Sequence, residues 1–131
     1  MINLKRAYEP ASPADGHRVL VDRIWPRGVS KAELKVERWD RDLAPSAELR
    51  RWFGHDPARW AEFRERYRDE LGQPDRQALL AEIADTARHD LVTLVYGAHD
   101  TAHNQAVVLK EVLGERLQAK RSAGGGQKGN A

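Results

Sequence analysis

The chain has 131 residues, of which 40% are hydrophobic and none is cysteine, and its formal net charge at pH 7 is +2. This length fits one domain, and the lack of cysteine excludes disulfides, thiolate metal sites and the cysteine nucleophiles of rhodanese-like enzymes and cysteine phosphatases. Without the roughly 18 consecutive apolar residues of a membrane span or the apolar stretch of a signal peptide, the chain is expected to be cytoplasmic.

The basic excess lies in the last segment of the chain. Residues 119–131 contain Lys120, Arg121 and Lys128 but no acid, and without these three of the 22 basic residues the 20 acidic residues slightly outnumber the bases. Nucleic-acid-binding domains concentrate positive charge on their folded part, so we do not expect nucleic acid as the main partner. The segment is also rich in glycine, which predicts a disordered tail after a single domain at residues 1–118.

The first third of the chain predicts two strands. Alternation of apolar and polar residues predicts a half-buried strand near residues 2–7, followed by a surface loop at residues 9–16. The run Val19–Val21 does not alternate, which favours a strand covered on both faces. It ends at Trp25–Gly28, where proline and glycine stop strand pairing.

The middle of the chain predicts helices. Ser30 and Glu33 have the spacing of a capping box, whereas residues 35–43 fit either a helix or irregular chain. Ser46 can cap a short helix that stops at Gly54, and Asp56-Pro57 is a strong signal for the start of the next helix. In that helix the residues at helical intervals are predicted to be core, namely Trp60, Phe63, Tyr67 and Leu71.

A further helix from about Pro74 is followed by the clearest strand, at residues 91–96, which is rich in β-branched and aromatic residues. A polar loop at residues 98–102 then leads into a final apolar-faced helix that reaches Leu117. Strands separated by helices pair in parallel when they share a sheet. The sequence therefore predicts a small single-domain α/β fold, a parallel sheet flanked by helices, with a helical insertion between the second and last strands.

Ligands of open α/β sheets bind beyond the carboxyl ends of the strands, which directs attention to residues 22–31. This segment holds a carboxylate, three cations and a rigid turn before a helix start, a combination that can hold a phosphate or a carboxylate. The alternative is a packed corner in which Asp22 pairs with an arginine. The candidate residues here are Asp22, Arg23, Arg27 and Lys31.

The second candidate cluster follows the last strand. His99 and His103 are four residues apart and could face one metal ion on a helix, with Asp100 as an oxygen ligand. Alternatively, His103 beside a carboxylate could act as a general base, or Asp100 or Thr101 could simply cap the helix while the histidines are solvated. Two histidines are weak evidence of metal, so we assign no metal and no cofactor. The candidate residues here are Tyr96, Asp100, His103 and Asn104.

A third, looser set surrounds the segment Ala44–Ser46. It contains Arg50, His55 and Ser46. Ser46 is predicted to be a helix cap and not a nucleophile, because neither a glycine elbow nor an adjacent histidine accompanies it.

Several motifs in order resemble domain-of-unknown-function family 488 (DUF488), the YeaO-like proteins, over residues 2–117. The resemblance implies a small bacterial or archaeal α/β protein, in a family whose activity is uncharacterised. Asp100, His103 and Asn104 match the family pattern best. The motifs are Val19–Gly28, Leu43–Ser46 with Leu49, Arg50, Trp52 and Phe53, then Trp60, Phe63 and Tyr67, and Val92–Tyr96 with Asp100, His103 and Asn104.

Three functional hypotheses follow. The first is an enzyme acting on a small phosphate- or nucleotide-like anion, in which Arg23, Arg27 and Lys31 hold the anion and Asp22 or His103 transfers a proton. In it, Asp100 and Asn104 would orient the histidine and the ligand, and Tyr96 would help to bind the ligand. The second is a non-catalytic ligand-binding or regulatory module that uses the same pocket, and the third is weak nucleic-acid binding through the tail. The oligomeric state is left open.

Overall fold

The structure is a computed structural model that describes residues 1–130, with side chains for residues 1–119. The sequence predicts a disordered tail at residues 119–131. The structure does not describe side chains from residue 120 onward, so the disorder of this tail stays a prediction. Among the described residues, none of the helices is long and apolar enough to cross a membrane.

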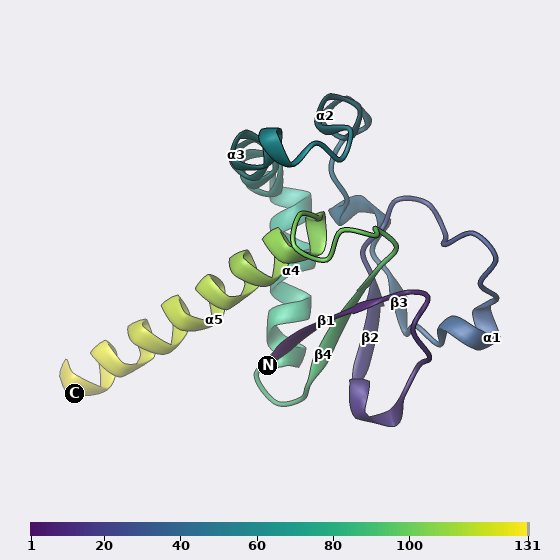
Figure 1. Cartoon of the computed structure of the whole chain (residues 1–131). Coiled ribbons are helices and arrows are strands. Elements are labelled where there is room, and N and C mark those ends of the chain that lie inside the picture. Colours follow the sequence, from purple (N-terminus) through teal and green to yellow (C-terminus); the bar gives the residue numbers. More distant parts are fainter. Residues whose placement is uncertain (131) are drawn as a thin grey trace.

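One parallel sheet is found in the described part of the chain, with strand order β1-β4-β2-β3 (Figure 1). Val92 of the central strand pairs with Ile2 on one side and with His17 on the other. This strand is buried along its whole length, as its β-branched and aromatic sequence predicts. The predicted α/β fold is therefore confirmed. The strands are β1 (Ile2–Arg6), β2 (His17–Leu20), β3 (Arg38–Trp39) and β4 (Val92–Tyr96).

The stretch at residues 35–43, which the sequence left open between helix and irregular chain, contains the short edge strand β3. Leu20 pairs with Trp39, and the Trp39 indole N–H donates a hydrogen bond of 2.7 Å to the backbone carbonyl of Asp22. β3 thus holds the segment that leaves β2, which fixes where Asp22 lies.

The predicted helix starts are found where the side chains satisfy free backbone N–H groups. The Ser30 hydroxyl accepts from the Glu33 N–H while the Glu33 carboxylate accepts from the Ser30 N–H, which confirms the capping box. Ser46 likewise caps the next helix, whereas Asp56 caps a 3₁₀ turn that precedes α3. The helices are α1 (Lys31–Leu34), α2 (Ala47–Phe53), α3 (Trp60–Leu71), α4 (Pro74–Ala87) and α5 (Gln105–Asn130).

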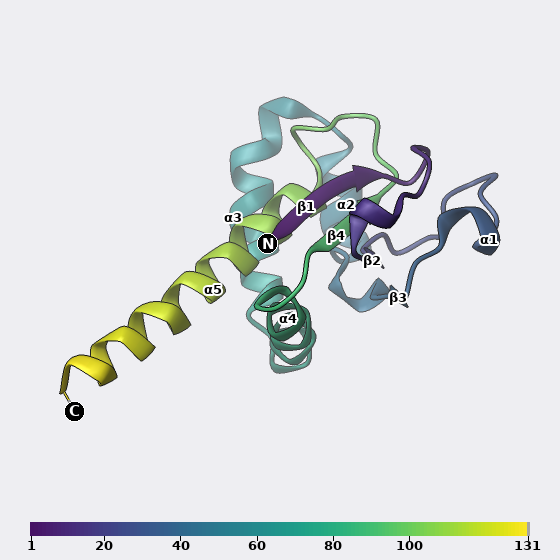
Figure 2. The same cartoon turned by 90° about the horizontal axis from the view of Figure 1, so that it is seen from below.

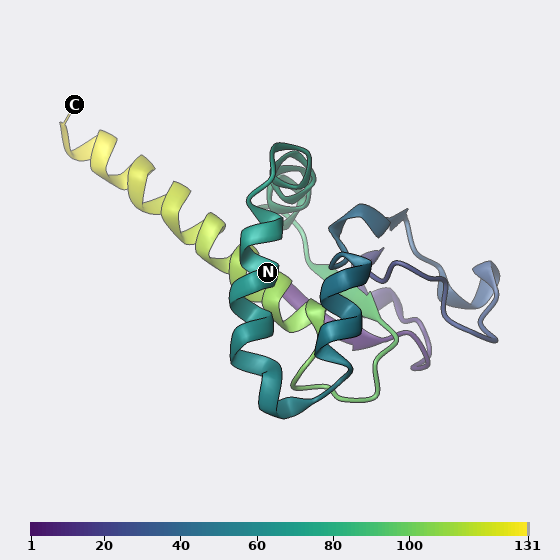
Figure 3. The same cartoon turned by 90° about the horizontal axis from the view of Figure 1, so that it is seen from above.

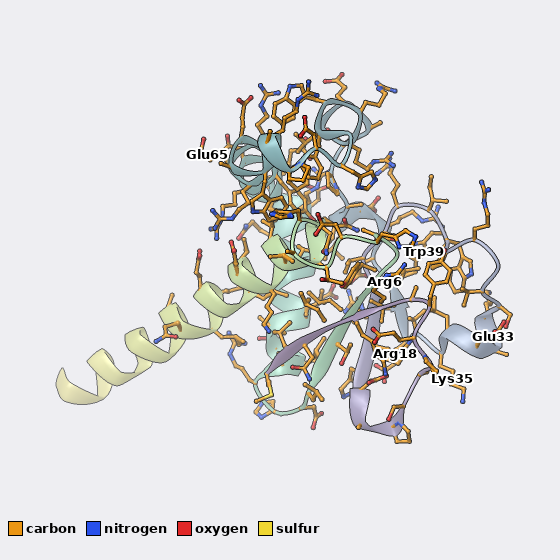
Figure 4. The ribbon with its side chains drawn as sticks, in the orientation of Figure 1. Arg6, Arg18, Glu33, Lys35, Trp39 and Glu65 are labelled. Atoms are coloured by element: carbon orange, nitrogen blue, oxygen red, sulfur yellow. The ribbon has the colours of Figure 1, made fainter. Side chains whose placement is uncertain are left out.

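The sheet is covered differently on its two faces. Helices α2–α5 lie on one side, and α1 lies on the other (Figures 2 and 3). On the α1 side, Leu20 and Val95 pack against Leu34, with Trp25 and Trp39 at the edge of this smaller core. Arg18, labelled in Figure 4, is buried on β2, where its guanidinium donates to the Leu34 carbonyl.

Most of the predicted core of α3 is buried. Phe63, Tyr67 and Leu71 are buried in the larger core between the helices and the sheet. Trp60 is only half-buried, so its prediction as a core residue is corrected: it lies at the first position of α3 and packs over the edge of the core.

Candidate functional site

Two adjoining cavities are lined by residues of α2 and of the segments that follow β2 and β4. In Figure 1, α2 lies above the ends of these strands. The α2 cavity has a volume of about 340 Å³, and the strand-end cavity has a volume of about 560 Å³. Both lie within the range of about 300–1,000 Å³ that is typical of small-molecule sites. The α2 cavity is lined by Pro45, Ala47, Arg50, Arg51, Phe53, His55, Phe63, His103, Asn104 and Gln105. The strand-end cavity is lined by Tyr8, Asp22, Arg23, Ile24, Trp25, Pro26, Arg27, Ala44, Pro45, Arg50, His55, Gly97, Ala98, His99, Asp100 and Gln105.

Arg50, on α2, belongs to the wall between the two cavities and lines both of them. Its Nε atom is buried and has no hydrogen-bond partner among the described residues. Two other buried side-chain atoms are unpaired, on Arg18 and Asp40, but neither residue lines either cavity. A buried N–H without a partner points to a missing acceptor, such as an ion, a water molecule or a ligand.

Asp22 lies in the floor of the strand-end cavity, and its carboxylate is tied to the last strand and the last helix. One oxygen accepts a hydrogen bond of 2.8 Å from the Gly97 N–H, and the other accepts from the Gln105 amide. Burial raises the pKa of the Asp22 carboxyl above its usual value, and these hydrogen bonds together with the charge of Arg50 offset only part of that rise. Asp22 therefore braces the floor of the cavity and keeps limited capacity to accept further hydrogen bonds.

Gly97 gives this brace its tight geometry, because a Cβ atom at this position would lie 2.9 Å from the nearer Asp22 oxygen. We predict that Gly97→Ala displaces the carboxylate and destabilises the fold by about 1–3 kcal/mol, as overpacking of a well-packed site does. Urea unfolding followed by circular dichroism measures the effect. Gly114→Ala in α5 is the matched control: its Cβ would meet no atom within 4 Å, so it should stabilise the helix by up to about 1 kcal/mol. Equal changes in the free energy of unfolding for the two substitutions would contradict the close contact between Gly97 and the Asp22 carboxylate.

Asp100 and His103 form a pair, with Asp100 lining the strand-end cavity and His103 lining the α2 cavity. The Asp100 carboxylate accepts backbone hydrogen bonds from Ala102 and His103, and its second oxygen lies 2.9 Å from His103 Nδ1. These bonds, first of all the one to the His103 ring, hold the pKa of Asp100 below its usual value. The His103 ring meets Trp60 edge-on at 5.2 Å and lines the α2 cavity. The carboxylate therefore fixes the histidine ring at the cavity wall.

Asn104 caps α5, in place of Asp100 or Thr101, which the sequence offered as one alternative for the cap. Its side-chain oxygen accepts from the backbone N–H groups of Ala106 and Val107, and its amide donates to the Asp100 carbonyl. Asn104 is buried and lines the α2 cavity with its polar atoms already engaged. Tyr96, at the end of β4, is buried and lines neither cavity, and burial raises the pKa of its phenol.

The first predicted cluster is only partly brought together. Arg23 and Arg27 are exposed and line the strand-end cavity. Lys31 begins α1 on the other side of the sheet and lines neither cavity; Glu33 and Lys35 mark this segment in Figure 4. Arg27 and His103 line adjoining cavities and not one common pocket, because the wall with Arg50 and Gln105 stands between them.

Four residues line both cavities and were not among the predicted site residues, namely Pro45, Arg50, His55 and Gln105. Arg50 and His55 were singled out only in the loose third set, and Gln105 was not singled out at all. His55 carries a signal that only the structure reveals: its backbone φ of +57° is in the left-handed region, which few residues other than glycine adopt. No local spacing could have placed these residues beside the strand ends.

The lining of the groove formed by both cavities is electropositive. It contains four arginines and three histidines, whereas the only two carboxylates among its lining residues, Asp22 and Asp100, already accept hydrogen bonds from protein groups. In the part of the chain with described side chains, no group of three or more histidine, aspartate or glutamate residues is placed so that it could hold a metal ion. The arginines are Arg23, Arg27, Arg50 and Arg51, and the histidines are His55, His99 and His103.

Comparison with known proteins places this chain among uncharacterised relatives. It is 43% identical over 112 residues to the uncharacterised protein YeaO of Escherichia coli (strain K12), covering 86% of this chain and 96% of YeaO. It is also 43% identical over 115 residues to Rv3073c of Mycobacterium tuberculosis (strain H37Rv), covering 88% and 95%. The uncharacterised protein Mb3100c of Mycobacterium bovis shows the same identity over the same length. No solved structure matches the chain.

The profile of the family DUF488-N3i, described as the inactive DUF488-N3 subclade, matches residues 1–129. This range covers the sheet, both cavities and most of α5. The sequence motifs from Val19 to Asn104, the match along nearly the whole length and the identity to YeaO agree with one another. The chain therefore belongs to the DUF488 family.

Proposed function

We propose that this protein is a non-catalytic module that binds a small anionic ligand in the groove below α2. The observation that carries the proposal is Arg50, whose buried Nε lacks a partner among the described residues while the side chain lines both cavities. A guanidinium is always charged and offers donors in a planar fork that suits a carboxylate or a phosphate. An anion at Arg50 would supply the acceptor that the protein itself does not.

The surroundings of Arg50 support the same ligand class. Arg23 and Arg27 line one side of the groove and Arg51 lines the other, so the field at Arg50 is positive. Asp22 also lines the strand-end cavity, and the hydrogen bonds that its two oxygens accept reduce its repulsion of an anion. The family description as an inactive subclade supports binding without turnover.

The test compares anion binding by the wild type and Arg50→Gln. Isothermal titration with inorganic phosphate and pyrophosphate at constant ionic strength should give saturable binding to the wild type, and Arg50→Gln should weaken it at least about tenfold, or about 1.4 kcal/mol. Arg66→Gln is the matched control, because Arg66 pairs with Glu62 on the exposed side of α3 and lines neither cavity. Absence of saturable binding, or equal affinity of both variants, would overturn the proposal.

A second candidate, catalysis, is favoured by one specific observation. Asp100 holds His103 through Nδ1, and His103 lines the α2 cavity, so its Nε2 could take up a proton as a general base does. If the groove turns over its ligand, His103→Gln should abolish phosphate release from p-nitrophenyl phosphate while inorganic phosphate binding persists. A wild type that binds phosphate but shows no release above a His103→Gln background supports the non-catalytic module.

A further inference from the structure

The α2 cavity has an aromatic wall. Phe53 and Phe63 line it with rings stacked at a centroid distance of 4.3 Å, and the ring of His55 lies 6.2 Å from that of Phe53. Flat rings in a cavity wall offer large contact areas and favour offset or edge-on packing with another ring. Pro45 and Ala47 make the rest of the apolar lining. This wall is therefore suited to a flat apolar group and not to a bare hydrated ion.

The polar groups that line the same cavity are suited to binding an anion. The Asn104 side chain is engaged at both ends, and the Gln105 amide donates to Asp22. The remaining polar side chains are those of two arginines and two histidines, and no carboxylate is found among the described residues that line this cavity. A ligand there meets the donors of Arg50 together with the rings of Phe53 and Phe63.

The size of the cavity argues against an inorganic anion alone. Its volume of about 340 Å³ corresponds to on the order of ten water molecules at about 30 Å³ each. A single phosphate at Arg50 would leave most of the aromatic wall in contact with water. A ligand that fills the cavity needs a body the size of a ring in addition to its charged group.

The backbone at the end of α2 brings an additional ring to this wall. Gly54 and His55 both have left-handed φ values, +54° and +57°, so the chain reverses immediately after Phe53. This reversal returns the His55 ring to the side of Phe53, at the junction of the two cavities. Residues held in sparsely populated backbone regions are found preferentially where they serve a site.

We propose that the ligand of the groove is an aromatic anion, a flat ring that carries a phosphate or a carboxylate. Its ring packs against Phe53 and His55 in the α2 cavity, and its anionic group binds at Arg50. This inference rests on the proposed function and specifies the class of its ligand.

The test uses pairs of ligands that share the charged group and differ in the ring. Phenyl phosphate is titrated against methyl phosphate, and benzoate against acetate, so that the two pairs also distinguish a phosphate from a carboxylate. In one pair or both, the ring should increase the affinity of the wild type by about tenfold. Equal affinity within both pairs overturns the aromatic ligand but leaves anion binding standing, whereas no binding of any of the four overturns both proposals.

Variants locate the ring. His55→Asn keeps a residue that tolerates the left-handed backbone but removes the imidazole, and Phe53→Leu removes the adjacent ring. Each should reduce the advantage of phenyl over methyl phosphate to about threefold or less, without changing the affinity for methyl phosphate. His89→Asn, at an exposed histidine that lines neither cavity, should keep the full advantage. If Phe53→Leu does not fold, His55→Asn decides alone; an unchanged advantage in it places the ring elsewhere and overturns the proposal.

Discussion

Replacement of Asp15 by alanine is expected to destabilise the protein by about 3–5 kcal/mol, the cost of leaving one member of a buried ion pair without its partner. Asp15 accepts hydrogen bonds of 2.8 Å from Arg18 and 3.0 Å from Lys5, and Arg18 is only 4% exposed. Without this carboxylate, the Leu34 carbonyl is the acceptor that remains for the Arg18 guanidinium among the described residues. Equilibrium unfolding in urea measures the loss.

Asp85→Ala serves as the control for this substitution. Asp85 also pairs with an arginine three residues away, Arg88, but its side chain is 70% exposed. Exposed pairs contribute between about 0 and 1 kcal/mol, so this variant should unfold close to the wild type. If Asp15→Ala costs no more than Asp85→Ala, the network on the α1 side of the sheet does not stabilise the fold.

The same carboxylate should make the stability depend on pH. Burial by itself would raise the pKa of Asp15, but hydrogen bonds from Ser12, Lys5 and Arg18 outweigh burial and hold the pKa below its usual value. A carboxyl with a lowered pKa in the folded state stabilises the protein above its unfolded pKa of about 3.9, and this contribution is lost as the pH falls through the folded pKa. Between pH 5 and the acid limit of folding, the free energy of unfolding of the wild type should therefore fall more than that of Asp15→Ala. The difference should equal the contribution of one titrating carboxyl group.

Local signals in the sequence predicted much of the fold. The Ser30–Glu33 capping box and the Ser46 cap are found as expected, because a cap depends on residues within one helical turn. The buried strand at residues 92–96 follows from its β-branched run. These features depend on neighbours in the chain, which is the information that spacing contains.

Features that depend on residues distant in the chain were harder to predict from the sequence. β3 has two residues and exists because Arg38 and Trp39 meet the edge of β2. β2 begins at His17, earlier than the apolar run suggested, since Arg18 is buried through its pairing with Asp15. A charged residue inside a buried strand interrupts the apolar pattern, so its burial is visible only once the partner is placed.

In the candidate site, too, the residues that depend on local position were predicted and those that depend on distant packing were not. Asp22, Asp100 and His103 were predicted because each follows the end of a strand, and the structure places all three around the groove. Arg50 reaches it from α2 and His55 from the turn after α2, and the position of this helix depends on the packing of Phe53 against Phe63. Their importance could not be read from spacing.

The final prediction concerns the residue on which that packing depends. Phe63→Ala is expected to destabilise the protein by about 3–5 kcal/mol, because the truncation of a buried phenylalanine leaves a cavity in addition to losing its burial energy. Phe63 is 2% exposed, and its ring lies 4.3 Å from Phe53, 5.6 Å from Trp60 and 5.7 Å from Tyr67 by centroid distance. It joins α2 to α3, so its loss weakens the attachment of the helix that carries Arg50.

Trp60→Ala provides the comparison that separates core packing from the rim of the groove. The helical interval alone would give Trp60 the same cost as Phe63, but Trp60 is half-buried, so its truncation should cost only about 1–2 kcal/mol. Its contact with the His103 ring should then be felt at the site, as a change in the His103 ring resonances in NMR spectra without global unfolding. Equal losses of stability for the two variants would restore Trp60 to the core and contradict the packing described for the first turn of α3.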